Sequence, residues 1–300
     1  MPRVSVVIPS YNRLHLLPEA LGSVRIQDSD DLEILVVDDG STDGTADADL
    51  GPDVRVIGQE NGGPSAARNL GVREARADLV AFLDSDDRWK PGKLEAQLPL
   101  LEADPAAVVA YAREEAIDET GAVVHIRPES TPTGDVLADL VEDNFLPTST
   151  VVVRREAFLA AGGFDEQMTH SEDWDLWLRL AEAGRFVAAA EVLSTYRFHE
   201  DQLIRDGLAL SRGKLRVYEK AYERLRDRPR PARRIRVHLA DRRIRLGRRL
   251  LKRGEREEGV RLLARAKGLT PFSGLRAIWA LVTTRGPKSD HSRSIHTERG

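Results

Sequence analysis

Short apolar runs alternate with stretches of helical periodicity along the first hundred residues. The apolar runs are bounded by Gly, Pro, Asn or Asp, which is typical of buried strands. The predicted strands are residues 4–9, 32–38, 54–58 and 79–83, and the predicted helices are residues 14–27, 65–75 and 93–103. Because strands that alternate with helices form parallel sheets, this pattern predicts an α/β fold with a parallel, doubly wound sheet.

The alternation of predicted strands and helices continues less regularly in the middle of the chain. Strands are predicted at 108–112 and 149–154, and helices at 155–161 and 173–183. The polar, turn-rich segment 119–135 between them is expected to be either an ordered loop or a mobile lid.

From residue 202 onward the pattern is helical and rich in arginine, with breaks at Arg228-Pro-Arg-Pro231 and at Gly254. The apolar positions that predict a helical hairpin there are Leu246, Leu250, Leu251, Val260, Leu262, Leu263 and Ala266. After Arg285 the sequence is polar, which predicts a disordered tail. We therefore expect an α/β domain over residues 1–202, an Arg-rich helical extension over 203–284 and a disordered tail over 285–300.

Charge divides the chain in the same place. Residues 203–300 contain 28 Lys and Arg against 10 Asp and Glu, whereas residues 1–202 contain 17 against 39. An acidic body joined to a basic extension predicts two modules with different partners. The sequence contains no cysteine, which excludes disulfides and cysteine-ligated metal sites.

The expected localisation is cytoplasmic. A strand is predicted from residue 4, which leaves no room for a signal peptide, and no apolar run approaches the roughly 18 residues of a spanning helix. The basic extension could either pack on the acidic body or hold the protein peripherally against anionic lipid at the inner face of the membrane. Residues 272–282 add a short apolar stripe, which would suit a membrane surface, a protein core or a homo-oligomer contact through the C-terminal helices.

Acidic residues follow two of the predicted strands directly. Asp38 and Asp39 end one strand in a turn-forming sequence, and Asp84-Ser85-Asp86 ends another. Carboxylates at the carboxyl ends of parallel strands lie where open α/β sheets bind ligands. Asp38 and Asp39 could serve only a turn, but a nucleobase or ribose ligand explains them better. An Asp-x-Asp unit can hold Mg²⁺ or Mn²⁺ together with substrate phosphates.

Three further motifs have both a structural and a functional interpretation. Tyr11, in Pro9-Ser-Tyr-Asn, lies at a strand end and could stack on a base, although the segment also resembles a helix cap. The acids of Glu172-Asp173-Trp-Asp175 complement a helix dipole, but they exceed what capping needs, so Asp173 is a candidate general base. Arg197 and His199 are candidates for holding phosphate and cation.

Taken together, these motifs resemble family 2 glycosyltransferases of the GT-A fold. The resemblance runs from Val4 to His199 and rests on six motifs in order. They are Val-Ile-Pro-Ser-Tyr-Asn12, Val-Val-Asp-Asp-Gly-Ser-Thr-Asp43, Asn-Gly-Gly-Pro-Ser-Ala-Ala-Arg-Asn69, Leu-Asp-Ser-Asp-Asp87, Glu-Asp-Trp-Asp-Leu-Trp177 and Tyr-Arg-Phe-His199. The implied fold is a nucleotide-sugar-binding sheet with helices on both faces, and residues 1–202 would be the catalytic domain.

The resemblance implies transfer of a sugar, with inversion, from a nucleoside-diphosphate sugar to an acceptor hydroxyl. The implied cofactor is Mn²⁺ or Mg²⁺, the commonest carrier in the family is UDP, and the expected setting is synthesis of cell-surface glycans or polysaccharides. The implied donor-binding residues are Pro9, Tyr11, Asp39, Asn61, Arg68, Asp84, Ser85 and Arg197. Asp86 and His199 would bind the metal, and Asp173 would be the base.

The expected partners are the nucleotide-sugar donor and a glycan or lipid-linked acceptor, with no nucleic acid. Two other functions stay open. A nucleotidyltransferase that makes nucleotide sugars also uses acidic metal ligands, but Tyr11-Asn-Arg-Leu-His15 is not the Gly-rich phosphate loop it would need. A non-catalytic nucleotide-sugar-binding protein would be expected to lack Asp86 or Asp173, and both are present.

Overall fold

A computed structural model describes residues 2–27, 31–197 and 207–283. The chain divides into two compact units, Met1–Gly213 and Lys214–Gly300, and the boundary lies within one helix, α7 (Gly207–Leu225).

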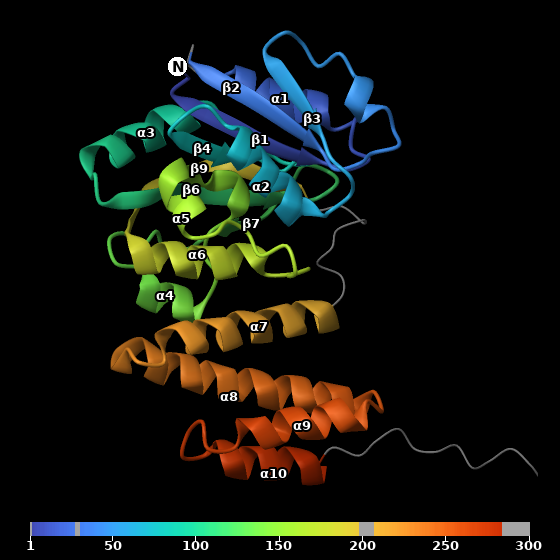
Figure 1. Cartoon of the computed structure of the whole chain (residues 1–300), viewed down its shortest axis with the longest axis vertical. Helices are drawn as coiled ribbons and strands as arrows, with labels where there is room; N and C mark the ends of the chain where they lie inside the picture. The colour runs from blue at the N-terminus through green and yellow to red at the C-terminus, as the bar shows by residue number, and fades with distance from the viewer. Residues whose placement is uncertain (1, 28–30, 198–206, 284–300) are drawn as a thin grey trace, which may run out of the picture. The chain divides into compact units, whose positions relative to one another are not determined.

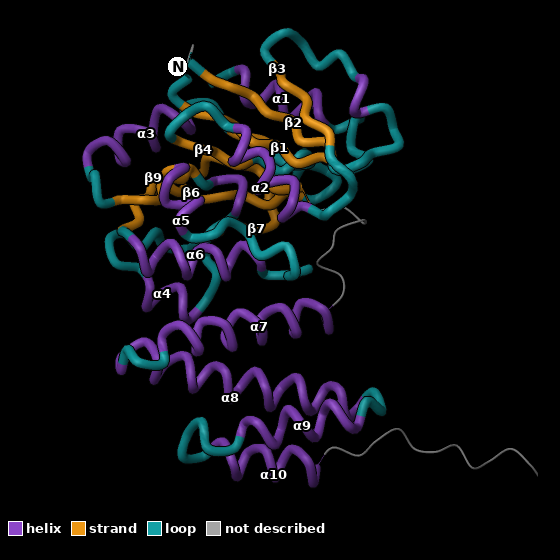
Figure 2. Tube along the Cα trace, viewed as in Figure 1, coloured by secondary structure: helices purple, strands orange, loops and turns teal. Residues whose placement is uncertain are grey.

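Within the described residues, the first unit is built on one sheet of nine strands (Figure 2). The strands are β1 (Val4–Ser10), β2 (Leu32–Asp38), β3 (Val54–Gly58), β4 (Leu79–Phe82), β5 (Arg88–Trp89), β6 (Ala107–Ile117), β7 (Val123–Arg127), β8 (Val152–Arg154) and β9 (Arg185–Arg197). Their order is β3-β2-β1-β4-β8-β6-β9-β5, and β7 pairs with β6 at the side of this path. The pairs among β1, β2, β3 and β4 are parallel, as is β6 with β9.

Among the described residues, six α-helices lie wholly within the first unit: α1 (Leu17–Arg25), α2 (Pro64–Glu74), α3 (Lys93–Ala103), α4 (Leu137–Glu142), α5 (Arg155–Ala160) and α6 (Glu172–Ala183). Short 3-10 helices lie at Thr45–Asp47 and Thr148–Thr150. The backbone N–H of Trp89 in β5 donates to Ser23 Oγ of α1 at 3.0 Å. The far end of the strand order therefore returns to α1, and the sheet is curled.

Helices cover both faces of the sheet, as the sequence predicts (Figure 1). Every residue of β1 is buried, and its alternating side chains enter two cores. Val6 and Ile8 pack in one core with residues of α1 and α3. Val7 faces α2 on the other side, where a Cβ at Gly71 would lie 2.4 Å from Val7 Cγ1. Only glycine allows α2 to approach the sheet this closely.

The structure confirms the predicted parallel pairing among β1, β2, β3 and β4, and it shows that the rest of the sheet is mixed. Strand β8 runs antiparallel to both β4 and β6. Residues 119–135 contain strand β7, antiparallel to β6, and are therefore more ordered than a loop or lid. The sequence pattern also missed β9, a strand of 13 residues whose burial does not alternate. Its run of alanines, which have weak strand propensity, explains the omission.

The second unit is helical, as predicted (Figure 2). It contains the end of α7 together with α8 (Pro229–Lys252), α9 (Arg256–Ala266) and α10 (Ser273–Thr283). Helices α8 and α9 form the predicted hairpin around the break at Gly254, and with α10 they share a small apolar core. No helix in the described ranges is both long and apolar enough to cross a membrane. The predicted disordered tail and His199 lie outside the described residues.

Candidate active site

Two acidic loops leave the same edge of the sheet. Strands β1, β2 and β4 are parallel, and Ser10 at the end of β1 pairs with Asp38 at the end of β2. Asp39 follows β2, and Asp84 lies just beyond β4. The carboxyl ends of these neighbouring strands therefore bring the two predicted acidic motifs to one side of the molecule.

Asp39 is nearly buried, and its carboxylate organises the loop that precedes α2. Oδ1 accepts hydrogen bonds from Gln59 Nε2 at 2.6 Å and from the Gly62 N–H at 2.8 Å. Oδ2 accepts one from the Gly63 N–H at 2.8 Å. These bonds fix the turn that starts at Asn61, so Asp39 shapes the loop whether or not it also touches a ligand. Its predicted contact with the nucleoside stays a prediction.

The surface beside this loop is accessible. Tyr11 is 50% exposed and Asn61 is also exposed, so both side chains can reach a ligand at the sheet edge. Pro9 is buried within β1 and would act by shaping the edge. Gly40 adopts φ +74°, and a Cβ there would lie 3.0 Å from the Asn61 backbone nitrogen. The close approach of these two loops therefore requires glycine at this position.

Arg68 lies on α2 and is buried between two acids. Its Nη2 donates to Asp84 Oδ1 at 2.6 Å, and its Nη1 lies 3.6 Å from Glu172 Oε1 at the start of α6. The guanidinium also lies 5.3 Å from the centre of the Phe164 ring. Burial alone would lower the pKa of Arg68, but the attraction of Asp84 and Glu172 outweighs it and raises that pKa. Arg68 therefore connects the Asp84–Asp87 loop, which follows β4, to α6. Its contact with the nucleobase or the phosphates of a donor stays a prediction.

The Asp84–Asp87 loop is held by Ser149, a residue of the short helix Thr148–Thr150. Ser149 Oγ accepts from the Asp84 N–H at 3.1 Å and donates to Asp87 Oδ2 at 2.5 Å. The Asp87 N–H donates to the Asp84 carbonyl oxygen at 3.0 Å, and this hydrogen bond closes the turn. Trp89 Nε1 donates to the Ser149 carbonyl at 2.7 Å, which fixes Ser149 in turn. Ser85, predicted to bind the donor, is buried in this loop.

The same loop concentrates negative charge. The pKa of Asp87 is raised well above its usual value, first by burial and then by repulsion from Glu114, Asp86 and Asp84. Such a group of carboxylates is unfavourable by itself and would be relieved by a divalent cation. No group of three or more His, Asp or Glu side chains within the described ranges forms a complete metal cage. Mg²⁺ is often held by one or two carboxylates plus substrate phosphates, so Asp86 with Asp84 fits this kind of site.

Asp173, the predicted base, is partly exposed in the first turn of α6. Its Oδ2 accepts from Asn144 Nδ2 at 2.9 Å, and its Oδ1 accepts from the Trp174 N–H at 2.7 Å. Burial raises the pKa of Asp173, while these two hydrogen bonds and the positive charges of Arg68 and Arg127 oppose the rise. A carboxylate with a raised pKa is a better proton acceptor, which suits a general base.

Arg127 comes from β7, in the segment that the sequence left as loop or lid. Its Nη2 donates at 2.9 Å to Oε1 of Glu114, which is almost fully buried, and its guanidinium lies 5.4 Å from the centre of the Tyr196 ring. Burial raises the pKa of Glu114, although Arg127 acts in the opposite direction. Arg127 is also among the positive charges that act on Asp173. The β6–β7 hairpin therefore contributes to the surroundings of the candidate base.

Arg197 ends β9 and is bound to α1. Its Nη2 donates to Glu19 Oε2 at 2.6 Å, and Arg88, two residues after Asp86, donates to the other oxygen of Glu19 at 2.6 Å. Arg197 thus lies close to the Asp84–Asp87 loop through a shared partner. Its role toward a diphosphate stays a prediction, as does that of His199.

Comparison with known proteins agrees with this geometry. The model of glycosyl transferase family 2 matches residues 5–160, which include the β1 edge, the Asp38–Asp39 turn and the Asp84–Asp87 loop. The chain belongs to glycosyl transferase family 2. An uncharacterized glycosyltransferase of Rickettsia felis is 33% identical over 199 residues, covering 65% of the chain and 33% of that protein. The putative teichuronic acid biosynthesis glycosyltransferase TuaG of Bacillus subtilis is 42% identical over 106 residues, covering 33% of the chain and 42% of that protein.

The chain therefore spans only about a third of the length of the first of these curated relatives. Two solved structures confirm the GT-A type of fold for this family 2 member. TarS of S. aureus in complex with UDP-GlcNAc superposes with a TM-score of 0.71 at 17% identity, over 93% of the chain and 89% of TarS. A mannosyltransferase of Pyrobaculum calidifontis in complex with GDP-Man and Mn²⁺ gives 0.60 at 21% identity, over 94% and 80%.

Sequence reasoning missed Ser149, Asn144 and Glu114. Asn144 and Ser149 act through contacts with Asp173 and Asp87, which are 29 and 62 positions away in sequence. Glu114 acts through Arg127, 13 positions away on the neighbouring strand. None of the three lies in a motif that signals such a contact. Pairings of this kind become visible only when the strands have been placed.

Proposed function

We propose that this family 2 protein is an inverting, metal-dependent glycosyltransferase. It would move a sugar from a nucleoside-diphosphate sugar, UDP-linked, to the hydroxyl of a glycan or lipid-linked acceptor in the synthesis of a cell-surface glycan or polysaccharide. The nucleotidyltransferase and non-catalytic alternatives gain no support from the family match. The named relatives, which include a putative teichuronic acid biosynthesis enzyme, favour the glycan setting.

One observation carries the proposal: Arg68 bridges the two halves of the site. It binds Asp84 in the Asp-x-Asp loop and lies beside Glu172, the neighbour of Asp173. Arg68 therefore fixes the acids suited to a metal–diphosphate complex in position relative to the candidate base. A transferase needs this arrangement because the leaving diphosphate and the attacking hydroxyl meet at a single carbon.

The residues divide into donor-holding and acceptor-activating groups. Asp86, with Asp84, would hold Mn²⁺ or Mg²⁺, which when bound neutralises the charge of the leaving diphosphate. Tyr11 and Asn61 would contact the nucleoside, and the Asp39-fixed loop would shape its pocket. Asp173 would take the proton of the acceptor hydroxyl. With one base and no covalent intermediate, a single in-line displacement inverts the configuration at the anomeric carbon.

The neighbours' complexes guide the choice of donor and metal. One was solved with UDP-GlcNAc and the other with GDP-Man and Mn²⁺. The first test is therefore the release of nucleoside diphosphate from a panel of UDP-, GDP- and dTDP-sugars, with Mn²⁺, Mg²⁺ or a chelator. We expect slow release from a UDP-sugar that requires the metal. Release of pyrophosphate would instead indicate a nucleotidyltransferase, and thermal stabilisation by nucleotide without any turnover would indicate a binding protein.

A further inference from the structure

Helix α10 packs its small residues inward and leaves its large apolar residues outside. Ala277 and Ala280 are buried in the core of the C-terminal unit. The opposite side of the helix carries the apolar face, whose members are Phe272 just before the helix (71% exposed), Leu275 (68%), Ile278 (49%), Trp279 (58%) and Val282 (76%). A helix normally buries its large apolar side chains, so four exposed ones on one side of a short helix, with Phe272 just before it, indicate a surface that binds a partner.

The surroundings of the apolar face are strongly basic. Helix α8 contains 10 Lys and Arg residues and a single acid, Asp241. Its Arg248 places a guanidinium 5.0 Å from the centre of the Trp279 ring. Arg276 on α10 and Arg245 on α8 both pair with Asp241, at 2.7 and 2.5 Å. Long basic side chains therefore adjoin the apolar face, and the one acid among them is shared by two arginines.

We propose that this face docks the C-terminal unit on the surface of an anionic lipid membrane. An apolar helix face with a tryptophan and neighbouring arginines matches helices that lie in the interface, where basic side chains meet acidic headgroups. The 11 residues of α10 extend about 16 Å, roughly half the hydrocarbon thickness of a bilayer, so the helix would lie along the surface. This proposal goes beyond sugar transfer and does not depend on it.

A second copy of the chain is a less suitable partner for the apolar face than an anionic membrane. Residues 214–283 contain 22 Lys and Arg against 7 Asp and Glu, a net charge of +15. Pairing two copies through α10 would bring two strongly positive units together, and like charges oppose such an association. Anionic headgroups instead complement the charge while their acyl chains accept the apolar side chains.

The tryptophans allow a direct test in the full chain. Trp89, Trp174 and Trp177 are at most 2% exposed, whereas Trp279 is 58% exposed. Transfer of α10 into lipid should therefore shift the intrinsic fluorescence to the blue through Trp279 alone. We expect this shift, with cosedimentation, on vesicles containing phosphatidylglycerol at low salt. Both should be weakened by high salt and nearly absent on pure phosphatidylcholine. The variant Trp279→Phe should cosediment without the shift.

Matched variants separate the apolar face from general basicity. The double variant Leu275→Ser/Ile278→Ser should weaken vesicle binding about tenfold or more. Val237→Ser should leave it unchanged, because Val237 is a half-exposed apolar residue of α8 outside the apolar face. The proposal is overturned by the absence of a shift at low salt, by equal binding to neutral vesicles, or by equal effects of the two variants. A shift that grows with protein concentration without lipid would overturn it in favour of self-association. Nucleoside diphosphate release in solution should be the same in all these variants.

Discussion

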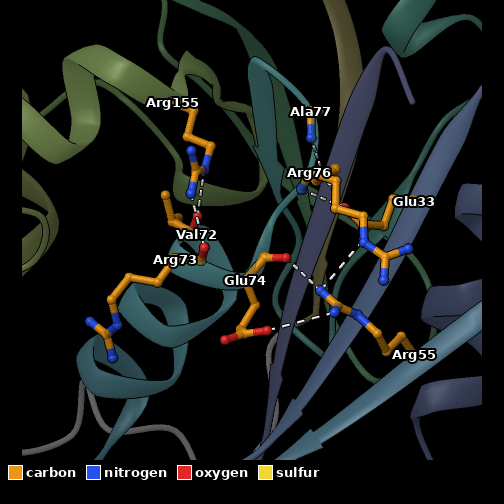
Figure 3. A network of polar contacts seen from close by, with 9 residues as sticks. Glu33, Arg55, Val72, Arg73, Glu74, Arg76, Ala77 and Arg155 are labelled. Atoms are coloured by element: carbon orange, nitrogen blue, oxygen red, sulfur yellow. Dashed lines mark hydrogen bonds and ion pairs between the residues drawn. The ribbon is translucent and has the colours of Figure 1, made fainter. Parts of the chain in front are cut away.

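The amino and carboxyl ends of the parallel strands differ in how closely their carboxylates are grouped. At the amino ends, Glu33 of β2 accepts hydrogen bonds from Ser5 Oγ and from the Arg76 N–H, and it faces the guanidinium groups of Arg55 and Arg76 (Figure 3). At the carboxyl ends, Asp84, Asp86 and Asp87 share one short loop, where their charges repel one another. A carboxylate surrounded by donors stabilises the fold, whereas carboxylates gathered against their own repulsion are suited to bind a cation.

The network at the amino ends extends this stabilising role. Arg55 also reaches the carbonyl and the carboxylate of Glu74 at the end of α2. Arg155 donates to the carbonyls of Val72 and Arg73 at 2.9 Å, so the last turn of α2 is capped by side chains (Figure 3). The two ends of the sheet thus differ in how acids are grouped: Glu33 and Glu74 lie among arginines, whereas three carboxylates are gathered in the Asp84–Asp87 loop, where Arg68 pairs with Asp84.

The largest effect is expected for Asp86→Ala. It should abolish metal-dependent donor binding, because it removes the carboxylate that we propose holds the cation. Stability should change little or even rise, since the substitution also removes a negative charge that repels Asp87. Titration with Mn²⁺ and nucleoside diphosphate measures the first effect and urea denaturation the second.

Glu33→Gln is the matched control for Asp86→Ala. It should leave donor binding intact but lower stability by about 1–3 kcal/mol, because buried donors lose a charged partner. Mn²⁺-dependent nucleotide binding that persists in Asp86→Ala would remove Asp86 from the metal site. Equal losses of stability in the two variants would contradict the proposed difference between the amino and carboxyl ends of the strands.

The next effect is expected for Asp173→Asn. The amide keeps the size of the side chain and still offers Asn144 an oxygen, but it cannot take a proton from the acceptor. Transfer should fall by about two to four orders of magnitude while donor affinity stays the same. The measurement is turnover at saturating donor together with donor binding by calorimetry. Wild-type turnover would show that another group is the base.

A smaller effect is expected for Ser149→Ala, which leaves Asp84, Asp86 and Asp87 in place and removes the hydroxyl that holds their loop. Asp87 loses its 2.5 Å hydrogen bond and the Asp84 N–H loses its acceptor. Unmet buried polar groups cost about 1–3 kcal/mol of stability. The Mn²⁺ concentration for half-maximal donor binding should rise. Ser149→Thr, which retains the hydroxyl, should recover most of the metal affinity, and failure to do so would assign Ser149 to packing alone.

The sequence revealed one half of the sheet much better than the other. Strands β1, β2, β3 and β4 are mostly apolar runs, and α-helices follow β1 and β3 directly, so local pattern and tertiary role agree. Strands β7, β8 and β9 depend on pairing with β6, whose partners lie far away in the sequence. Local composition carries little information about such pairings, so the sequence indicated neither the direction of β8 nor the existence of β7 and β9.

The residues of the site can likewise be predicted from the sequence in one half of the sheet better than in the other. The acids at the ends of β2 and β4 were predicted because a charged residue after an apolar strand is visible in the sequence. The sequence does not indicate Arg127, because residues 119–135 predict an ordered loop or a mobile lid, and the contact of Arg127 with Glu114 needs the β6–β7 pairing. The residues that orient a reactive group are therefore harder to predict than the group itself.

The smallest effect, a shift along the pH axis, is expected for Asn144→Ala. The charged groups that act on Asp173 are Arg68, Arg127 and the adjacent Glu172. Burial raises the pKa of Asp173, and the Asn144 hydrogen bond is among the contacts that lower it. Removing Asn144 should raise the pKa further. A base works only when deprotonated, so the acidic limb of the kcat/KM profile should move to higher pH.

The plateau of that profile at high pH should be nearly unchanged, because Asp173 is deprotonated there with or without its partner. Measuring kcat/KM for transfer across pH in wild type and Asn144→Ala distinguishes this effect from general damage. Damage to the fold lowers the whole profile without moving it. A shift of the limb to lower pH would contradict the assignment of Asp173 as the base, since loss of a stabilising donor cannot make its carboxylate easier to ionise.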